Sequence, residues 1–78
     1  MTTPIPELST VALTQDLPAL GLRTGDVGTV VLTHRAGEGY TVEFCDLTGD
    51  TVGVATVEAS QVRPIEHGEV ANARRRAG

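Results

Sequence analysis

The stretch GLRTGDVGTVV, residues 21–31, combines three glycines with a run of β-branched residues, and it decides the fold class. A phosphate-binding loop places its glycines after a strand and at the start of a helix. Here Gly25 and Gly28 lead into the sequence TVVLTH, which favours a strand, and no Lys-Ser or Lys-Thr pair follows. We therefore expect these glycines to supply a positive φ or a close backbone approach at a turn into a strand.

Patterns typical of β-strands lie on both sides of this stretch. Runs rich in β-branched or alternating residues occur at 10–15, 27–34, 40–46, 51–57 and 62–65, with turn signals between them. Five such strands predict an all-β fold, a small five-stranded antiparallel SH3-like barrel. Its expected interior consists of Val11, Leu13, Val30, Leu32, Val42, Phe44, Val57 and Val62.

The other segments complete the predicted organisation of this single domain of 78 residues. Residues 16–26 form a long first connection, and residues 58–61, EASQ, predict a short 3₁₀ turn. We expect a flexible N-terminus at 1–6, the barrel at 7–65 and a flexible, disordered basic tail at 66–78.

Several features favour a cytoplasmic protein. No apolar run approaches the roughly 18 residues that a membrane-spanning helix needs. The first nine residues lack the basic and apolar regions of a signal peptide, so we expect none. Cys45 is the single cysteine, which excludes an internal disulfide.

Charge is divided between the body of the chain and its end. Residues 1–69 contain all ten acidic residues and three arginines, a formal charge of −7, whereas Arg74, Arg75 and Arg76 make the tail basic. An acidic body repels a phosphate backbone, and one Tyr with one Phe gives no platform for stacked bases. These features disfavour nucleic acid as a partner.

No group of residues has the spacing of a catalytic or metal site. A hairpin centred near Gly37 would place His34 opposite Tyr40 and Cys45 opposite Thr29, about 17 Å apart along the strand. Cys45 also stands close to two acidic residues, which disfavour a reactive thiolate. The remaining histidine, His67, falls in the expected tail. We expect no enzyme, no metal and no cofactor.

The segments LSTVALTQDLPALGLRTGDVGTVV and VEASQVRPI resemble a family of small bacterial proteins of unknown function. The shared pattern is Leu-x-Thr-Val…Asp-Leu-Pro…Gly-Leu…Gly-Asp-x-Gly-Thr-Val…Glu-Ala-Ser-x-Val/Leu-Arg-Pro, over residues 7–65. The family resembles SH3-like barrels, with 16–26 in the place of the RT loop and 58–61 in that of the 3₁₀ turn. Genes of this kind are thought often to adjoin a partner gene, sometimes in toxin–antitoxin-like pairs. The resemblance therefore implies an antitoxin-like or accessory partner of a neighbouring gene product.

The strand at 51–57 is apolar on both faces, whereas a strand covered on one side alternates. The turn LTGD would pair Phe44 with Gly53, and a slip of one residue would exchange the two faces of the strand. In either register some valines point outward. Contiguous exposed apolar residues often mark an interface, although β-branched residues also suit exposed strands. In the first register the outward set is Val31, Cys45, Val52 and Val54.

The first hypothesis is a non-catalytic protein-interaction module that binds a protein partner or a second copy of itself. The outward set would make the contact, and Asp16 and Asp26 would steer a basic partner. Because GDVGTVV is similar to the turn of KOW domains, one alternative is a KOW-like RNA-binding module that uses Arg74, Arg75 and Arg76. A second alternative, by analogy of fold with nitrile hydratase-type enzymes, is a non-catalytic barrel subunit of a larger enzyme. No membrane role is expected.

Overall fold

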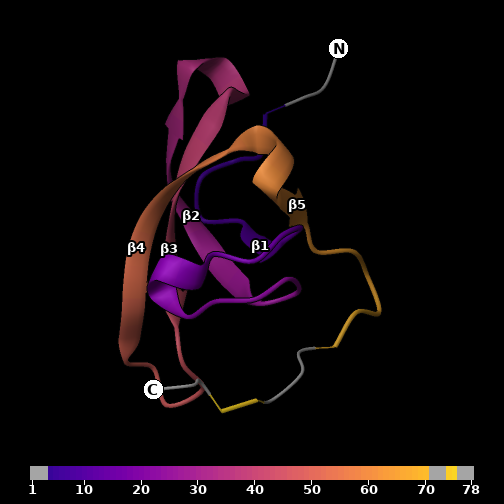
Figure 1. Ribbon diagram of the computed structural model, residues 1–78. Helices are drawn as coiled ribbons and strands as arrows, with labels where there is room; N and C mark the ends of the chain where they lie inside the picture. The colour runs from indigo at the N-terminus through magenta and orange to yellow at the C-terminus, as the bar shows by residue number, and fades with distance from the viewer. Residues whose placement is uncertain (1–3, 71–73, 76–78) are drawn as a thin grey trace.

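Five antiparallel strands form one curled, open sheet in the computed structural model, which describes residues 4–70, 74 and 75 (Figure 1). The strands are β1 Thr10–Leu13, β2 Val27–His34, β3 Gly39–Cys45, β4 Thr51–Glu58 and β5 Val62–Pro64. Three 3₁₀ turns connect them: η1 Pro18–Leu20, η2 Arg35–Gly37 and η3 Ala59–Gln61. The predicted small all-β fold with five antiparallel strands is confirmed.

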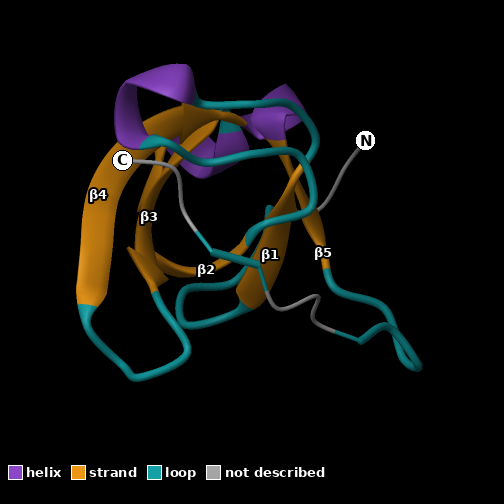
Figure 2. Cartoon of the chain, turned by 60° about the horizontal axis from the view of Figure 1, so that its bottom comes forward, coloured by secondary structure: helices purple, strands orange, loops and turns teal. Residues whose placement is uncertain are grey.

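The order of strands across the sheet is β4-β3-β2-β1-β5, so β4 and β5 are its two edges. In Figures 1 and 2, β4 and β5 lie at opposite margins of the molecule, and β2 and β3 curve between them. The long connection after β1 contains η1, where the amide of Leu17 donates to the carbonyl of Leu22 at 2.9 Å.

Both glycines at the entrance to β2 have the roles that the sequence predicts. Gly25 has a φ of +90°, a conformation that favours glycine. A Cβ on Gly28 would lie 2.6 Å from the Val42 side chain and 2.9 Å from the carbonyl oxygen of Glu43. The strand β2 begins directly at Val27, and no helix follows the glycines.

The core is a cluster of buried side chains to which all five strands contribute. Its largest fully buried side chains are Phe44, Leu13, Val11, Val30 and Val42. Seven of the eight predicted interior residues are buried, and Leu22 and Tyr40 join them. The Tyr40 hydroxyl accepts a hydrogen bond from the amide of Ile5 at 2.9 Å, and Ile5 packs against the core. Residues 1–3 of the expected flexible N-terminus lie outside the described residues.

Leu32 is the interior residue that the sequence analysis placed wrongly, since its side chain is 47% exposed. Val30 pairs with Val42, but Leu32 pairs with Thr41, so Val31 is an extra residue in β2. A bulge of this kind shifts the alternation by one residue and moves the following side chains to the opposite face.

The same bulge corrects the predicted register of the hairpin between β2 and β3. His34 pairs with Gly39 instead of Tyr40, and Thr29 pairs with Glu43 instead of Cys45.

Of the two registers that the sequence left open between β3 and β4, the first is present over most of the ladder. Phe44 pairs with Gly53, and the pairs Val42–Ala55 and Tyr40–Val57 follow. Cys45, however, pairs with Thr51, which leaves Val52 as an extra residue. Val52 is half-buried and packs against the core, so its predicted outward position is wrong.

Candidate functional site

The outer edge of β4 is the first candidate surface. Within the described chain no strand pairs with β4 on the side away from β3. The amide of Ala59 donates to the carbonyl of Glu38 at 3.1 Å, just beyond the pair Gly39–Glu58. In an antiparallel ladder, this contact makes Gly39–Glu58 a pair without mutual hydrogen bonds.

The alternation of an antiparallel ladder then fixes where the other amides of β4 point. Gly53, Ala55 and Val57 direct their backbone N–H groups toward β3, whereas Val54 and Thr56 direct theirs away from the sheet. The amide of Glu58, which also points away, donates to Oε1 of Gln61 at 2.7 Å. The backbone of Val54 and Thr56 can therefore pair with an added strand.

The two edges of the sheet differ in how they are protected. Proteins commonly guard an edge strand by making it short or by placing proline, charge or a bulge in it. β5 has three residues and includes Pro64. β4 has eight residues and no charge before Glu58, and its bulge lies near its start. The unprotected part of the edge is the stretch 53–57.

The outer face of the sheet carries exposed apolar residues that do not form one patch. Val31 is 40% exposed and Val54 is 55% exposed. Glu43 lies between Val54 on β4 and Thr29 on β2, because it pairs with both. Cys45 is exposed at the end of β3. The predicted outward set is therefore divided, and Val54 is the member that lies on the free edge.

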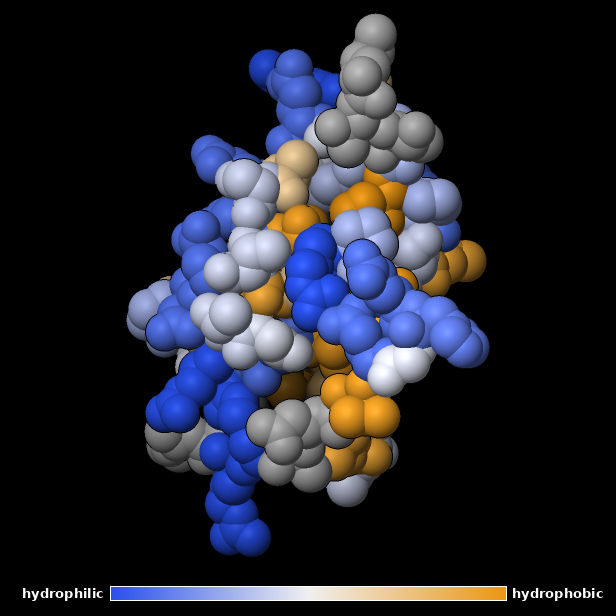
Figure 3. All heavy atoms as spheres, turned by 90° about the vertical axis from the view of Figure 1, so that its right-hand side faces the viewer, coloured by the Kyte–Doolittle hydropathy of each residue, from blue (hydrophilic) through white to orange (hydrophobic). Residues whose placement is uncertain are grey.

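Exposed apolar residues also occur elsewhere, at Leu8 and Val70 for example. Figure 3, which shows the β5 side of the molecule, has hydrophobic atoms at the surface among hydrophilic ones. Single exposed apolar residues are common in folded proteins. Exposure alone does not distinguish β4. Its outer edge does, because no strand among residues 4–70, 74 and 75 pairs with it.

The acidic residues of the connection 16–26 hold that connection in shape. Oδ1 of Asp16 accepts hydrogen bonds from the backbone amide of Thr24 at 2.8 Å and from the Thr24 hydroxyl at 3.1 Å. The backbone hydrogen bond from Thr24 is the main cause that lowers the pKa of Asp16. Oδ2 of Asp26 accepts the amide of Arg23 at 2.8 Å.

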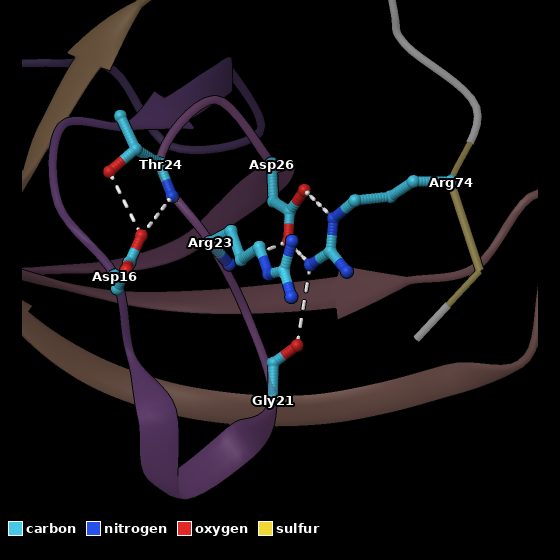
Figure 4. A network of polar contacts seen from close by, with 6 residues as sticks. All are labelled: Asp16, Gly21, Arg23, Thr24, Asp26 and Arg74. Carbon is cyan, nitrogen blue, oxygen red and sulfur yellow. Dashed lines mark hydrogen bonds and ion pairs between the residues drawn. The ribbon is translucent and has the colours of Figure 1, made fainter. Parts of the chain in front are cut away.

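Arg74 from the C-terminal segment binds to the same connection (Figure 4). Its Nε donates to Oδ1 of Asp26 at 2.9 Å, and its Nη2 donates to Oδ2 of Asp26 and, at 3.3 Å, to the carbonyl of Gly21. The side chains of Arg74 and Asp26 are 23% and 19% exposed. Burial opposes ionisation of Asp26, but the hydrogen bonds from Arg74 and the Arg23 amide outweigh it and lower the pKa.

The structure thus joins two residues that the sequence analysis assigned to different surfaces. Asp26 was expected to steer a partner and Arg74 to contact RNA, and they form an ion pair across 48 positions of sequence. The sequence feature that could have indicated this contact is the opposite charge of residues 1–69 and of the C-terminal arginines. Arg75 is exposed, and Arg76 lies outside the described residues.

A second ion pair connects the start of the predicted tail to β5. Both carboxylate oxygens of Glu69 accept hydrogen bonds from the Arg63 guanidinium, at 2.7 and 2.9 Å. The hydrogen bond from Arg63 is the main cause that lowers the pKa of Glu69 to about 2. Of the expected disordered tail, 71–73 and 76–78 lie outside the described residues.

The residues considered as metal ligands do not lie together. His34 lies at one end of the hairpin between β2 and β3, where its Nε2 lies 2.6 Å from the Thr41 hydroxyl. Cys45 lies at the other end of β3. Over residues 4–70, 74 and 75, no three His, Cys, Asp or Glu side chains are grouped so that they could hold a metal ion. The same residues include no helix long and apolar enough to span a membrane.

Comparison with known proteins gives one match. A family model described as a domain of unknown function (DUF4926) matches residues 7–64. No curated protein and no solved structure matches the chain. The SH3-like character of the sheet therefore stays a prediction.

Proposed function

The chain belongs to the DUF4926 family, a domain family of unknown function, and we propose that it is a non-catalytic protein-interaction module that binds through the free edge of β4. A strand of the partner would extend the sheet and pair with the outward backbone groups of Val54 and Thr56. In this proposal the chain is antitoxin-like or an accessory partner of a neighbouring gene product, and a non-catalytic barrel subunit of a larger enzyme stays the alternative. The proposed setting is the cytoplasm, which the single cysteine supports.

The observation that carries this proposal is the eight-residue edge strand, whose free amides alternate with amides that pair with β3. An added strand gains main-chain hydrogen bonds there without any change in the sheet. The side chain of Val54, which is 55% exposed, would supply apolar contact beside those bonds. Val54 thus keeps its place in the predicted interface, whereas Val52 loses it by packing against the core.

A second copy of the chain is the other possible occupant of this edge. Two β4 strands can pair antiparallel about a twofold axis, and residues 51–57 bring no like charges together. A complex with a partner protein and a dimer of the chain differ in mass, so a measurement of mass distinguishes them.

The test replaces Thr56 with proline. Thr56→Pro removes an N–H that points away from β3, so the fold should survive because the ladder to β3 keeps its bonds. Thr56→Ala is the matched control, because it changes the same side chain and keeps the amide. Light scattering after size-exclusion chromatography gives the mass of the chain alone, and mass spectrometry identifies proteins that it retains from native lysate.

We expect the wild type and Thr56→Ala to form the same dimer or to retain the same partner. The affinity of Thr56→Pro for that dimer or partner should be lower by a factor of about ten or more. Ala55→Pro removes an amide that donates to β3, and it should unfold the chain under conditions in which Thr56→Pro stays folded. Equal association of Thr56→Pro and wild type would reject the β4 edge as the interface.

RNA binding through Arg74, Arg75 and Arg76 has less support from the structure. Arg74 donates to Asp26, so an RNA phosphate would have to compete with that carboxylate. Asp16 and Asp26 accept hydrogen bonds within the chain and have lowered pKa values, so they keep the negative charge that would attract a basic partner.

A further inference from the structure

We propose that the turn 21–26 forms an arginine-binding site, that Arg74 of the same chain occupies this site in the free protein, and that an arginine of the partner displaces Arg74. The displacement by a partner rests on the proposed function. The binding of an arginine side chain does not, and it can be tested without a partner.

The contacts of Arg74 match the shape of a guanidinium group. Nε and Nη2 donate in parallel to the two carboxylate oxygens of Asp26, and Nη2 also donates to the carbonyl of Gly21. A planar fork of donors that meets a carboxylate at two points is specific to arginine. A lysine ammonium is a point charge and cannot reach both oxygens and the carbonyl with the same geometry.

The acceptor groups are held in place by the fold before the guanidinium arrives. The carbonyl of Asp26 accepts the amide of Leu13 from β1 at 2.9 Å, and the amide of Gly25 donates to the carbonyl of Leu13 at 2.8 Å. The amide of Arg23 fixes Oδ2 of Asp26. A site of this kind loses little conformational entropy when it binds its ligand.

The surroundings also favour a cation. Asp16 lies on the other side of the same connection, where it holds the backbone of Thr24, and its negative charge acts on Arg74 (Figure 4). Arg23 is a second cation beside this site: its backbone amide donates to Asp26, and its charge also acts on that carboxylate. The body of the chain, residues 1–69, has a formal charge of −7, which attracts a basic segment over a longer range.

Arg74 reaches this site from a position 48 residues away, so its occupancy is an intramolecular binding equilibrium. Any other arginine side chain offers the same donors to Asp26 and Gly21. While Arg74 is bound, the apparent affinity for such an arginine falls in proportion to the free fraction of the site. The C-terminal segment would thus reduce the binding of weak basic ligands.

The experiment uses the full chain and two capped tripeptides, Gly-Arg-Gly and Gly-Lys-Gly, with backbone amide NMR shifts of residues 21–26 as the readout. The variants are Arg74→Ala, which empties the site, and Arg74→Ala with Asp26→Asn, which removes its charge. An asparagine at 26 can still accept the amide of Arg23, so the turn is expected to keep its shape.

We expect Arg74→Ala to bind the arginine peptide with shifts confined to the site, and the wild type to bind it more weakly. If Arg74 occupies the site for about three-quarters of the time, the apparent Kd rises about fourfold. The lysine peptide should bind on the order of tenfold more weakly than the arginine peptide, and the double variant should bind neither.

Three results would overturn the proposal: no binding of the arginine peptide by Arg74→Ala, equal binding of both peptides, or equal affinity of the wild type and Arg74→Ala. Because these titrations involve no strand pairing, a negative result would not bear on the proposal that a partner binds at the edge of β4. Loss of association in Thr56→Pro likewise says nothing about the arginine site. The two proposals can therefore fail separately.

Discussion

At the scale of single residues, Gly28 is the glycine at which an added Cβ would make the shortest contacts. It lies in β2 opposite Val11, and the core packs directly against its backbone. A Cβ there would come within 2.6 Å of Val42 Cγ1, 2.8 Å of Phe44 Cδ1 and 2.9 Å of the Glu43 carbonyl oxygen. Since one of these atoms belongs to the backbone of β3, a side-chain rotation cannot relieve the contact.

We therefore expect Gly28→Ala to destabilise the fold by about 1–3 kcal/mol, the usual cost of an overpacked core. Gly53→Ala is the matched control, because that strand glycine faces the end of the flexible Leu20 side chain at 3.3 Å. Urea unfolding of both variants measures the difference in the free energy of unfolding. Equal losses at the two positions would contradict the backbone contact at Gly28.

At the scale of elements, the two edge strands are stabilised in different ways. β5 has three residues and hydrogen bonds to β1, and Arg63 within it pairs with Glu69 beyond its end. β4 depends on its long ladder with β3. An ion pair therefore holds the segment after β5 against the sheet, and the strength of this ion pair depends on pH and salt.

The pH dependence of the ion pair between Arg63 and Glu69 follows from the pKa of Glu69. Its pKa is lowered from 4.5 to about 2, so the stabilising effect is complete above pH 4.5 and is lost as the pH falls toward 2. A carboxyl-detected NMR titration should give a midpoint near 2. Arg63→Gln should raise that midpoint toward 4.5, because it removes the main hydrogen bond to the carboxylate.

Arg35→Gln, a change in the turn between β2 and β3, is the control and should leave the Glu69 midpoint unchanged. High salt should raise the midpoint in the wild type, because the pair is exposed to solvent. A midpoint for Glu69 that is the same with and without the Arg63 guanidinium would show that the two side chains do not pair in solution.

At the scale of the whole molecule, the distribution of charge brings the C-terminal segment onto the body. The acidic body and the basic residues 74–76 attract each other, and Arg74 meets Asp26 beside η1. The same distribution sets a barrier to nucleic acid, because a body with a formal charge of −7 repels phosphate.

Truncation after Glu69 removes the C-terminal arginines and so tests whether they bind RNA. We expect the wild type to show no RNA binding in fluorescence anisotropy at about 50 mM salt, since Asp26 competes for Arg74 and the body repels the backbone. The truncated chain should behave in the same way. Binding by the wild type that weakens steeply with salt and disappears on truncation would instead support the RNA-binding alternative.

The sequence by itself determined the all-β class, the positions of the five strands and the roles of Gly25 and Gly28. It left two registers between β3 and β4 open, one residue apart. The class, the strands and the glycine roles follow from local patterns of β-branched runs and turn residues. The pair Phe44–Gly53 lies beyond the bulge at Val52, and next to the turn Cys45 pairs with Thr51.

Only the tertiary structure decided the bulges at Val31 and Val52, which moved Leu32 outward and Val52 toward the core. It also decided that β4 and β5 are the edges of the sheet in the described part of the chain, and that Asp26 binds Arg74. A bulge offsets the alternation of the residues before it from that of the residues after it, and composition gives no reliable signal of it. A contact across 48 positions depends on where the folded chain brings its ends, which no local pattern encodes.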